Sequence, residues 1–216
     1  MVIPKAAFPV LYPILDTGIL PPPGAARQAA LRVLVQELAE AGVTILQYRN
    51  KQGSQDEILE DARIMRSAAG ARIKLILNDW PALAVEAEFD GVHVGQQDMS
   101  PGEARKIVGS GRIVGVSTHN EIQVRDAEKE PVDYIAVGPI YATASKQNPD
   151  PVIGLEGIRM ARTLTSKSLV AIGGITMTTA LEVRSAGADS IAVISAIFAG
   201  SGRPAKLAKD FLDIFR

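Results

Sequence analysis

Short apolar runs alternate with longer amphipathic stretches along the whole chain. The runs predict eight strands, at residues 11–15, 44–48, 74–77, 91–94, 113–116, 134–137, 169–172 and 190–194. Most of these runs are continuous apolar blocks, which are typical of strands that are covered on both faces. The pattern therefore indicates a mostly parallel sheet with helices packed against it.

The stretches between the runs have helical spacing. Residues 25–41 place Leu31, Leu34, Val35 and Leu38 on one face, and residues 56–69 follow the same rule. Further helices are expected from a start at 176–179 and over 205–215. Eight strands alternating with helices predict one (β/α)8 barrel, a TIM barrel, that occupies residues 1–216 as a single domain. An open doubly wound sheet shares the alternation and is the alternative.

Composition limits the classes of function. The 216 residues carry a net charge of −1 and only 5% aromatic residues, which argues against a nucleic-acid surface. No apolar run is long enough to span a membrane, and no signal peptide is expected. The chain contains no cysteine, which fits a reducing cytoplasm. We therefore expect small phosphorylated molecules as ligands, and the sequence leaves a homo-oligomer open.

Charged side chains follow the second, third and fourth predicted strands. Arg49 and Lys51 come after the second, and as like charges held together they point to a phosphate or diphosphate. Asp79 and Asp98 follow the next two strands, and paired carboxylates suit Mg²⁺. Each acid could instead cap the helix that begins after it. In a barrel these strand ends share one face, so the set predicts a Mg²⁺-assisted diphosphate site.

Two histidines have different predicted roles. His93 lies inside an apolar run, which favours a hydrogen-bonded residue of the barrel interior. His119 follows the fifth strand with Ser117, so it could act as a base or simply precede the next helix.

Small and hydroxylated residues follow the last three strands. Gly173 and Gly174 follow the seventh strand and Ser195 follows the eighth, a frequent position for a phosphate site in barrels. The long loop after the sixth strand, which begins at Gly138-Pro139, carries Thr143, Ser145 and Lys146. Such a loop is either an anion-binding segment or an ordinary connection. The neighbouring strand ends favour the first interpretation.

These segments in series resemble the thiamine-phosphate synthase family. The matching stretches are 47–51, 78–79, 91–98, 114–119, 138–146, 171–176 and 193–197. The resemblance implies a (β/α)8 barrel that joins a hydroxymethylpyrimidine diphosphate to a thiazole phosphate and releases pyrophosphate. It also implies dissociation of pyrophosphate before attack by the thiazole nitrogen.

The resemblance assigns roles by position. The pyrimidine diphosphate would contact Gln47, Tyr48, Arg49, Asn50, Lys51, Asn78, Ser117 and Lys146. Among these, Arg49, Lys51, Ser117 and Lys146 would be catalytic. Asp79 and Asp98 would bind Mg²⁺, the expected cofactor. The thiazole phosphate would contact Thr143, Ala144, Ser145, Gly174, Ile194 and Ser195.

Two other functions are compatible with parts of this pattern. A thiazole tautomerase is a similar barrel that isomerises a thiazole phosphate with a histidine. His119 is a candidate for that histidine, so this function remains an alternative. A non-catalytic phosphate-binding barrel is the third reading. The basic residues and the acid pair favour the synthase, because an isomerase has no use for a diphosphate site.

Overall fold

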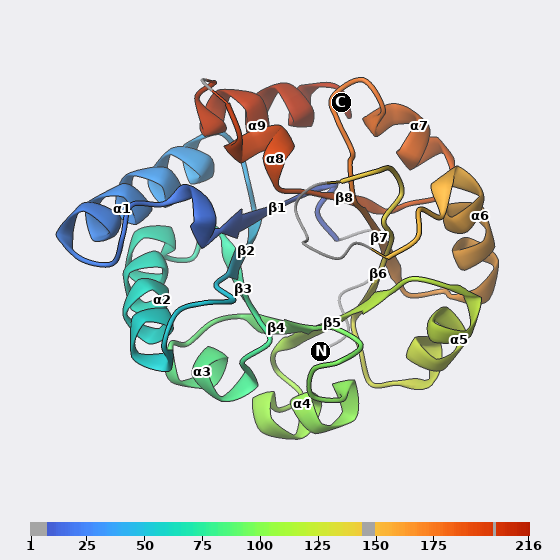
Figure 1. Ribbon diagram of the computed structural model, residues 1–216, viewed down its shortest axis with the longest axis horizontal. Coiled ribbons are helices and arrows are strands. Elements are labelled where there is room, and N and C mark those ends of the chain that lie inside the picture. Colours follow the sequence, from blue (N-terminus) through green and yellow to red (C-terminus); the bar gives the residue numbers. More distant parts are fainter. Residues whose placement is uncertain (1–7, 144–149, 201) are drawn as a thin grey trace.

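The chain forms a closed barrel of parallel strands surrounded by helices, in a computed structural model that describes residues 8–143, 150–200 and 202–216 (Figure 1). Strand order around the barrel follows the sequence, and the last strand pairs with the first. The strands are β1 (Leu11–Asp16), β2 (Ile45–Arg49), β3 (Lys74–Asn78), β4 (Gly91–Val94), β5 (Ile113–Thr118), β6 (Tyr134–Val137), β7 (Ser168–Ile172) and β8 (Ser190–Val193). The predicted (β/α)8 barrel is confirmed.

Helices cover the outside of the barrel in the described part of the chain (Figure 1). They are α1 (Ala25–Glu40), α2 (Gln55–Ala69), α3 (Pro81–Glu86), α4 (Pro101–Val108), α5 (Glu121–Lys129), α6 (Gly154–Leu164), α7 (Ala180–Ser185), α8 (Ser195–Phe198) and α9 (Pro204–Asp213). A short 3-10 helix, η2 (Thr17–Ile19), follows β1. The predicted helical segments all form, with ends shifted by at most four residues.

Side chains of each strand alternate between two cores. In β2, Ile45 belongs to a small cluster inside the barrel, whereas Leu46 and Tyr48 belong to the large cluster under the helices. Because side chains on a strand alternate with a period of two, Gln47 and Arg49 face the same side as Ile45. This alternation decides which polar residues reach the barrel mouth.

Several strands extend beyond their apolar runs. Asp16, Arg49 and Asn78 end their strands, and Ser117 and Thr118 are the last two residues of β5, although all five are polar. A strand predicted from its apolar residues alone is therefore too short at the end where the barrel opens to solvent. These added residues mark the carboxyl ends of the strands, where barrel enzymes place their active sites.

A repeated ion pair closes the opposite end of the barrel. An arginine in the last turn of α2, α4 and α6 binds an aspartate that directly precedes β4, β6 and β8, and each aspartate also accepts an N–H from the preceding strand. The sets are Arg66–Asp90–Leu75, Arg105–Asp133–Val114 and Arg162–Asp189–Leu169, with Arg–Asp distances of 2.7, 2.5 and 2.8 Å. These contacts tie helix to sheet far from the mouth.

Among the described residues, no helix combines the length and the apolar character that crossing a membrane requires.

Candidate active site

Two cations at the mouth are each held by a carboxylate. Arg49 at the end of β2 forms an ion pair with Asp16 at the end of β1. Lys51, in the loop after β2, pairs with Asp79 and lies 3.9 Å from Asp98 Oδ1. The sequence predicts that Asp79 and Asp98 face this basic pair, and the structure adds Asp16 as a third carboxylate. The cluster of three carboxylates and two cations has a formal charge of −1.

The carboxylates of Asp79 and Asp98 are close enough to share a hydrogen bond. Burial raises the pKa of Asp79 to about 6, and the hydrogen bond with Asp98 adds to that effect while Lys51 opposes it. The pKa of Asp98 is lowered. Burial acts against this change, but the hydrogen bonds from Asp79 and the Gly95 N–H, together with the charge of Lys51, outweigh it. Two carboxylates held against each other are unfavourable without a cation between them.

This pair fits the donor set of Mg²⁺. The ion takes oxygen ligands and commonly uses only one or two protein carboxylates, with water and phosphate oxygens completing its shell. Within the residues described, no group of three or more His, Asp and Glu side chains could hold a metal. Asp79 and Asp98 would therefore be the protein's ligands, with Lys51 beside them.

Neither acid is a helix cap. Trp80 is the N-cap of α3 and makes no side-chain cap, while Ser100 caps α4 with its own hydroxyl. Asp79 has a backbone φ of 69°, in the left-handed region that non-glycine residues seldom adopt. Strained residues of this kind cluster at functional sites. The capping alternative is therefore wrong for both residues.

A hydrogen-bonded chain crosses the barrel below the acids. Gln47 donates to Tyr12 at 2.9 Å, and the Tyr12 hydroxyl lies 2.9 Å from that of Tyr134. Tyr134 bonds His93 Nδ1 at 2.8 Å, and His93 Nε2 bonds Ser117 Oγ at 2.8 Å. His93 is thus a satisfied interior histidine, as predicted. The chain fixes the orientation of Gln47 and Ser117, two of the predicted site residues.

Asn78 is the last residue of β3, and its side chain is buried at the mouth. Its Nδ2 is a buried donor without a hydrogen-bond partner among the described residues. A buried donor left unpaired costs free energy, so such groups call for an explanation. An acceptor on a bound ligand would supply the missing partner.

Two predicted site residues have buried side chains that bond to other parts of the protein. The Tyr48 side chain is fully buried under the helices and donates to Asp61 on α2. The Asn50 side chain is also buried and bonds Tyr48 and the backbone of its own loop. The expectation that the Tyr48 side chain contacts the diphosphate does not fit this geometry, whereas Asn50 lines a pocket together with Arg49 and Lys51. The reason is the alternation along β2, which sends Gln47 and Arg49 to one side and Tyr48 to the other.

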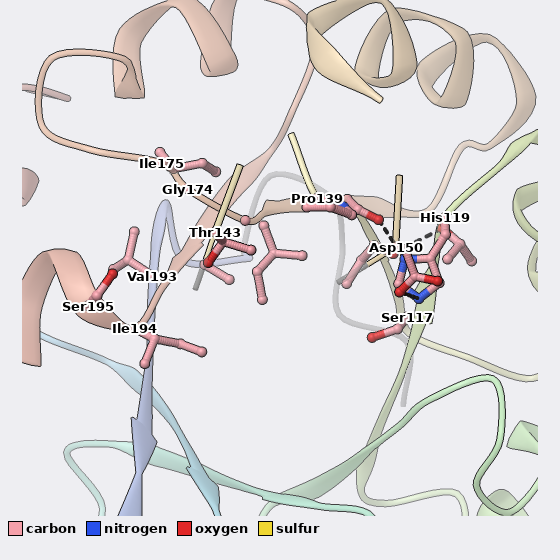
Figure 2. A pocket seen from close by; sticks show the side chains of 16 residues that line it. Ser117, His119, Pro139, Thr143, Asp150, Gly174, Ile175, Val193, Ile194 and Ser195 are labelled. Carbon is pink, nitrogen blue, oxygen red and sulfur yellow. Dashed lines mark hydrogen bonds and ion pairs between the residues drawn. The ribbon is translucent and has the colours of Figure 1, made fainter. Parts of the chain in front are cut away.

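A pocket opens at the carboxyl ends of β5 to β8 (Figure 2). Its lining includes Ser117, His119, Thr143, Gly174, Ile194 and Ser195. Figure 2 shows Thr143, Ile194 and Ser195 on one side of the pocket and Ser117, His119 and Asp150 on the other. The pocket therefore collects the predicted residues from the loops after β6, β7 and β8. It adjoins the acid–cation side through Ser117, which His93 binds from below.

Both ring nitrogens of His119 face protein groups. Nδ1 donates to the Gly138 carbonyl at 2.5 Å, and Nε2 lies 3.3 Å from Asp150 Oδ2 (Figure 2). A general base needs a nitrogen directed at its substrate. His119 instead connects the two ends of the loop after β6. It precedes α5, which Asn120 caps.

The first part of the loop after β6 is fastened to β7. Ile140 and Tyr141 donate their N–H groups to Ile172 and Gly173 at 2.9 Å each. This pairing brings Thr143 to the pocket. The predicted ligands Ala144, Ser145 and Lys146 lie outside the described residues.

Sequence reasoning missed three residues of the site. Asp16 directly follows the first apolar run, a position that could have marked it as a mouth residue. Tyr12 and Tyr134 lie inside the barrel and carry the hydrogen-bonded chain. A glycine inside the fifth apolar run, Gly115, could have indicated a large side chain on the neighbouring strand. In the structure Gly115 pairs with Tyr134, and a Cβ at position 115 would overlap the tyrosine ring.

Comparisons with known proteins agree with this geometry. The family model described as thiamine monophosphate synthase matches residues 11–197. A thiamine-phosphate synthase of Koribacter versatilis is 50% identical over 207 residues, which is 96% of each chain. One of Chloroflexus aurantiacus is 39% identical over 88% of this chain and 85% of its own. Among solved structures, a thiamine phosphate pyrophosphorylase of Pyrococcus furiosus superposes with a TM-score of 0.82 at 30% identity, covering 98% of this chain and 96% of its own.

The family model spans every strand of the barrel, and the first of these relatives aligns over nearly the whole chain. The chain therefore belongs to the thiamine monophosphate synthase family.

Proposed function

We propose that this protein condenses a hydroxymethylpyrimidine diphosphate with a thiazole phosphate, giving thiamine phosphate and pyrophosphate. It would thus be a transferase of thiamine biosynthesis. The observation that carries the proposal is the pairing of two different sites at one barrel mouth. An acid–cation cluster suits a metal-bound diphosphate, and the adjoining pocket suits a second, smaller ligand.

The diphosphate would bind on the side of β1 to β5. Arg49 and Lys51 would exchange their carboxylate partners for phosphate oxygens, which also form charge-assisted hydrogen bonds with guanidinium and ammonium groups. Asp79 and Asp98 would hold Mg²⁺, which supplies a positive charge that stabilises the leaving pyrophosphate. The free Nδ2 of Asn78, with Gln47 and Ser117, would orient the pyrimidine. Lys146 is assigned to the diphosphate from the family resemblance alone.

The thiazole phosphate would occupy the pocket at β5 to β8. Gly174, with a φ of 64°, and Ser195, the first residue of α8, line this pocket and would offer backbone N–H groups to the phosphate. The first N–H groups of a helix lack partners within it. Thr143 would add a hydroxyl donor, and Ile194 an apolar contact. The assignment of Ala144 and Ser145 to this ligand also rests on the resemblance.

The reaction needs little acid–base chemistry. The bond between the pyrimidine methylene and the diphosphate oxygen breaks, and its electron pair leaves with pyrophosphate. The guanidinium of Arg49 and the ammonium of Lys51 stabilise that developing charge. The thiazole nitrogen then donates its lone pair to the methylene carbon. Holding both ligands at one mouth supplies the proximity that this step requires.

The tautomerase alternative rests on His119. Its two ring nitrogens both contact protein groups, the Gly138 carbonyl and the Asp150 carboxylate, so a base role would require breaking one of these contacts. A non-catalytic phosphate-binding barrel would not require Mg²⁺-dependent release of pyrophosphate, for which the acid pair is suited. Both alternatives are therefore weaker than the synthase.

Incubation of the purified protein with both substrates and Mg²⁺ tests the proposal. We expect equal amounts of thiamine phosphate and pyrophosphate, identified by chromatography and mass spectrometry. Isomerisation of the thiazole phosphate when it is incubated alone would instead support the tautomerase. Binding of phosphate ligands without any product would support the non-catalytic barrel.

Gly174→Ala should weaken binding of the thiazole phosphate. A Cβ at position 174 would lie 2.5 Å from the Ala142 carbonyl oxygen and 2.8 Å from the Tyr141 Cβ, so the segment leading to Thr143 must shift. We expect the Kd measured by calorimetry to rise by about tenfold, equivalent to about 1.4 kcal/mol.

Gly109→Ala is the matched control. Gly109 also has a positive φ, of 75°, but a Cβ there meets nothing within 4 Å. We expect this variant to lose about 1 kcal/mol of stability because of the backbone conformation, and to keep its thiazole phosphate affinity. Equal loss of affinity in the two variants would contradict the assignment of Gly174.

A further inference from the structure

Four buried side chains form a hydrogen-bonded chain between the barrel and the helices α1 and α2. Arg27 Nη1 donates to Asp61 Oδ2 at 3.2 Å, and the Tyr48 hydroxyl donates to the same oxygen at 2.6 Å. Asn50 Nδ2 in turn lies 3.2 Å from the Tyr48 hydroxyl. All four residues are less than 9% exposed. We refer to Arg27, Asp61, Tyr48 and Asn50 as the buried relay.

Each end of the buried relay holds a loop at the barrel mouth. Asn50 Oδ1 accepts the N–H of Gly53 at 2.8 Å and that of Gln52 at 3.3 Å, which shapes the turn that carries Lys51. At the other end, Arg27 Nε donates to the Pro21 carbonyl at 2.7 Å, in the loop between β1 and α1. The relay therefore links two loops that flank Arg49.

The turn rests closely on Asn50. A Cβ at position 53 would overlap the Asn50 side-chain amide, so the turn packs against this group as well as bonding to it. Arg49 and Lys51 lie on the two sides of Asn50 in the sequence. Fixing Asn50 thus fixes the direction in which both cations leave the strand end.

Stability alone is a weak reason for this arrangement. A buried ion pair is often no more stable than apolar residues of the same volume, because both charges lose their hydration. The side chains of Arg27 and Asp61 are 10% and 5% exposed. Burial raises the pKa of Tyr48 well above its usual range, and the hydrogen bond to Asp61 raises it further. The Tyr48 hydroxyl therefore remains a donor.

We propose that Arg27, Asp61, Tyr48 and Asn50 are positioning residues that hold the turn 50–53 so that Arg49 and Lys51 converge on one diphosphate. The proposal rests on the proposed function for the identity of the ligand. None of the four side chains needs to touch that ligand. Their effect passes through the backbone of the turn.

A second buried pair provides a control for stability. Asp133 is 2% exposed and binds Arg105, but this pair lies at the opposite end of the barrel from the mouth. Asp133→Asn should lower the melting temperature without moving any loop of the site. Tyr48→Phe removes a single hydroxyl and keeps the packed ring, so we expect it to fold.

Calorimetry with inorganic pyrophosphate and Mg²⁺ tests the proposal without requiring turnover. We expect Tyr48→Phe to raise the Kd for pyrophosphate about tenfold, the effect of losing one buried hydrogen bond to a charged group. The Kd for thiazole phosphate should stay within about twofold. Asp133→Asn should change neither Kd. Asn50→Ala, at the turn itself, should reproduce the effect of Tyr48→Phe.

Hydrogen exchange of the Gln52 and Gly53 amides separates positioning from general destabilisation. In folded Tyr48→Phe these two amides should exchange faster, while those in β6 remain as in the wild type. Unchanged pyrophosphate affinity in both Tyr48→Phe and Asn50→Ala would overturn the proposal. A wild-type protein that binds pyrophosphate but forms no thiamine phosphate would count against the proposed function and leave the positioning test intact.

Discussion

Asp98→Asn should lower the rate of pyrophosphate release by about three orders of magnitude, which corresponds to about 4 kcal/mol of transition-state stabilisation. Asp98 is one of two carboxylates available for Mg²⁺, and the amide has the same shape without the charge. The substitution also replaces the ionised carboxylate that accepts a hydrogen bond from Asp79 with a neutral and weaker acceptor. The readout is a coupled assay for pyrophosphate at saturating concentrations of both substrates.

The matched control for Asp98→Asn is Asp16→Asn. This change removes one negative charge from the same cluster, but Asp16 pairs with Arg49 and not with the acid pair. We expect Asp16→Asn to keep at least about a tenth of the activity, because the proposed metal ligands remain. Similar losses in both variants would show that the charge of the cluster matters and the metal contact does not.

Asp98→Asn should leave the thiazole phosphate site unchanged. The pocket at β5 to β8 is lined by residues of other loops, and Asp98 is not among them. Calorimetry should therefore give a Kd for thiazole phosphate within about twofold of the wild type. A matching loss of thiazole affinity would contradict the division of the mouth into two sites.

Asp133→Asn should lower the free energy of unfolding by about 3 kcal/mol, because it leaves the charge of Arg105 partly buried without its partner. Asp133 also accepts the Val114 N–H at 2.8 Å and so holds β5 in place. Urea denaturation followed by circular dichroism measures the loss. The kinetic constants should stay within about twofold, since residues at this end of a barrel serve stability.

Asp126→Ala is the control for that prediction. Asp126 pairs with Lys129 on the surface of α5, where their side chains are 66% and 76% exposed. Surface pairs contribute about 0–1 kcal/mol, so this variant should unfold almost as the wild type does. Equal destabilisation by both substitutions would contradict the structural role assigned to the Arg–Asp pairs.

The barrel could be predicted from the sequence because its signals are local. Each strand is a short apolar block, and the amphipathic spacing between the blocks shows the helices. The ends of the strands were harder to predict. Asp16 and Ser117 are polar, yet both still belong to the sheet, since at the barrel mouth a strand can carry hydrophilic side chains.

The site was only partly predictable. Arg49, Lys51, Asp79 and Asp98 were expected together because they follow neighbouring strands. Their mutual pairing depends on side-chain distances that no spacing reveals. The direction of Tyr48 follows from alternation along β2, but its partner Asp61 lies on helix α2, outside that strand. The same applies to the Arg–Asp pairs at the far end, whose members are at least 24 residues apart.

Calorimetry of each anion with and without Mg²⁺ tests the two-site arrangement most directly. The cluster around Arg49 and Lys51 has a formal charge of −1, so a diphosphate should bind weakly until a divalent cation reverses that balance. We predict that Mg²⁺ raises the affinity for the pyrimidine diphosphate at least about tenfold and changes that for thiazole phosphate by less than about twofold. An equal effect on both ligands, or none on the diphosphate, would contradict this arrangement.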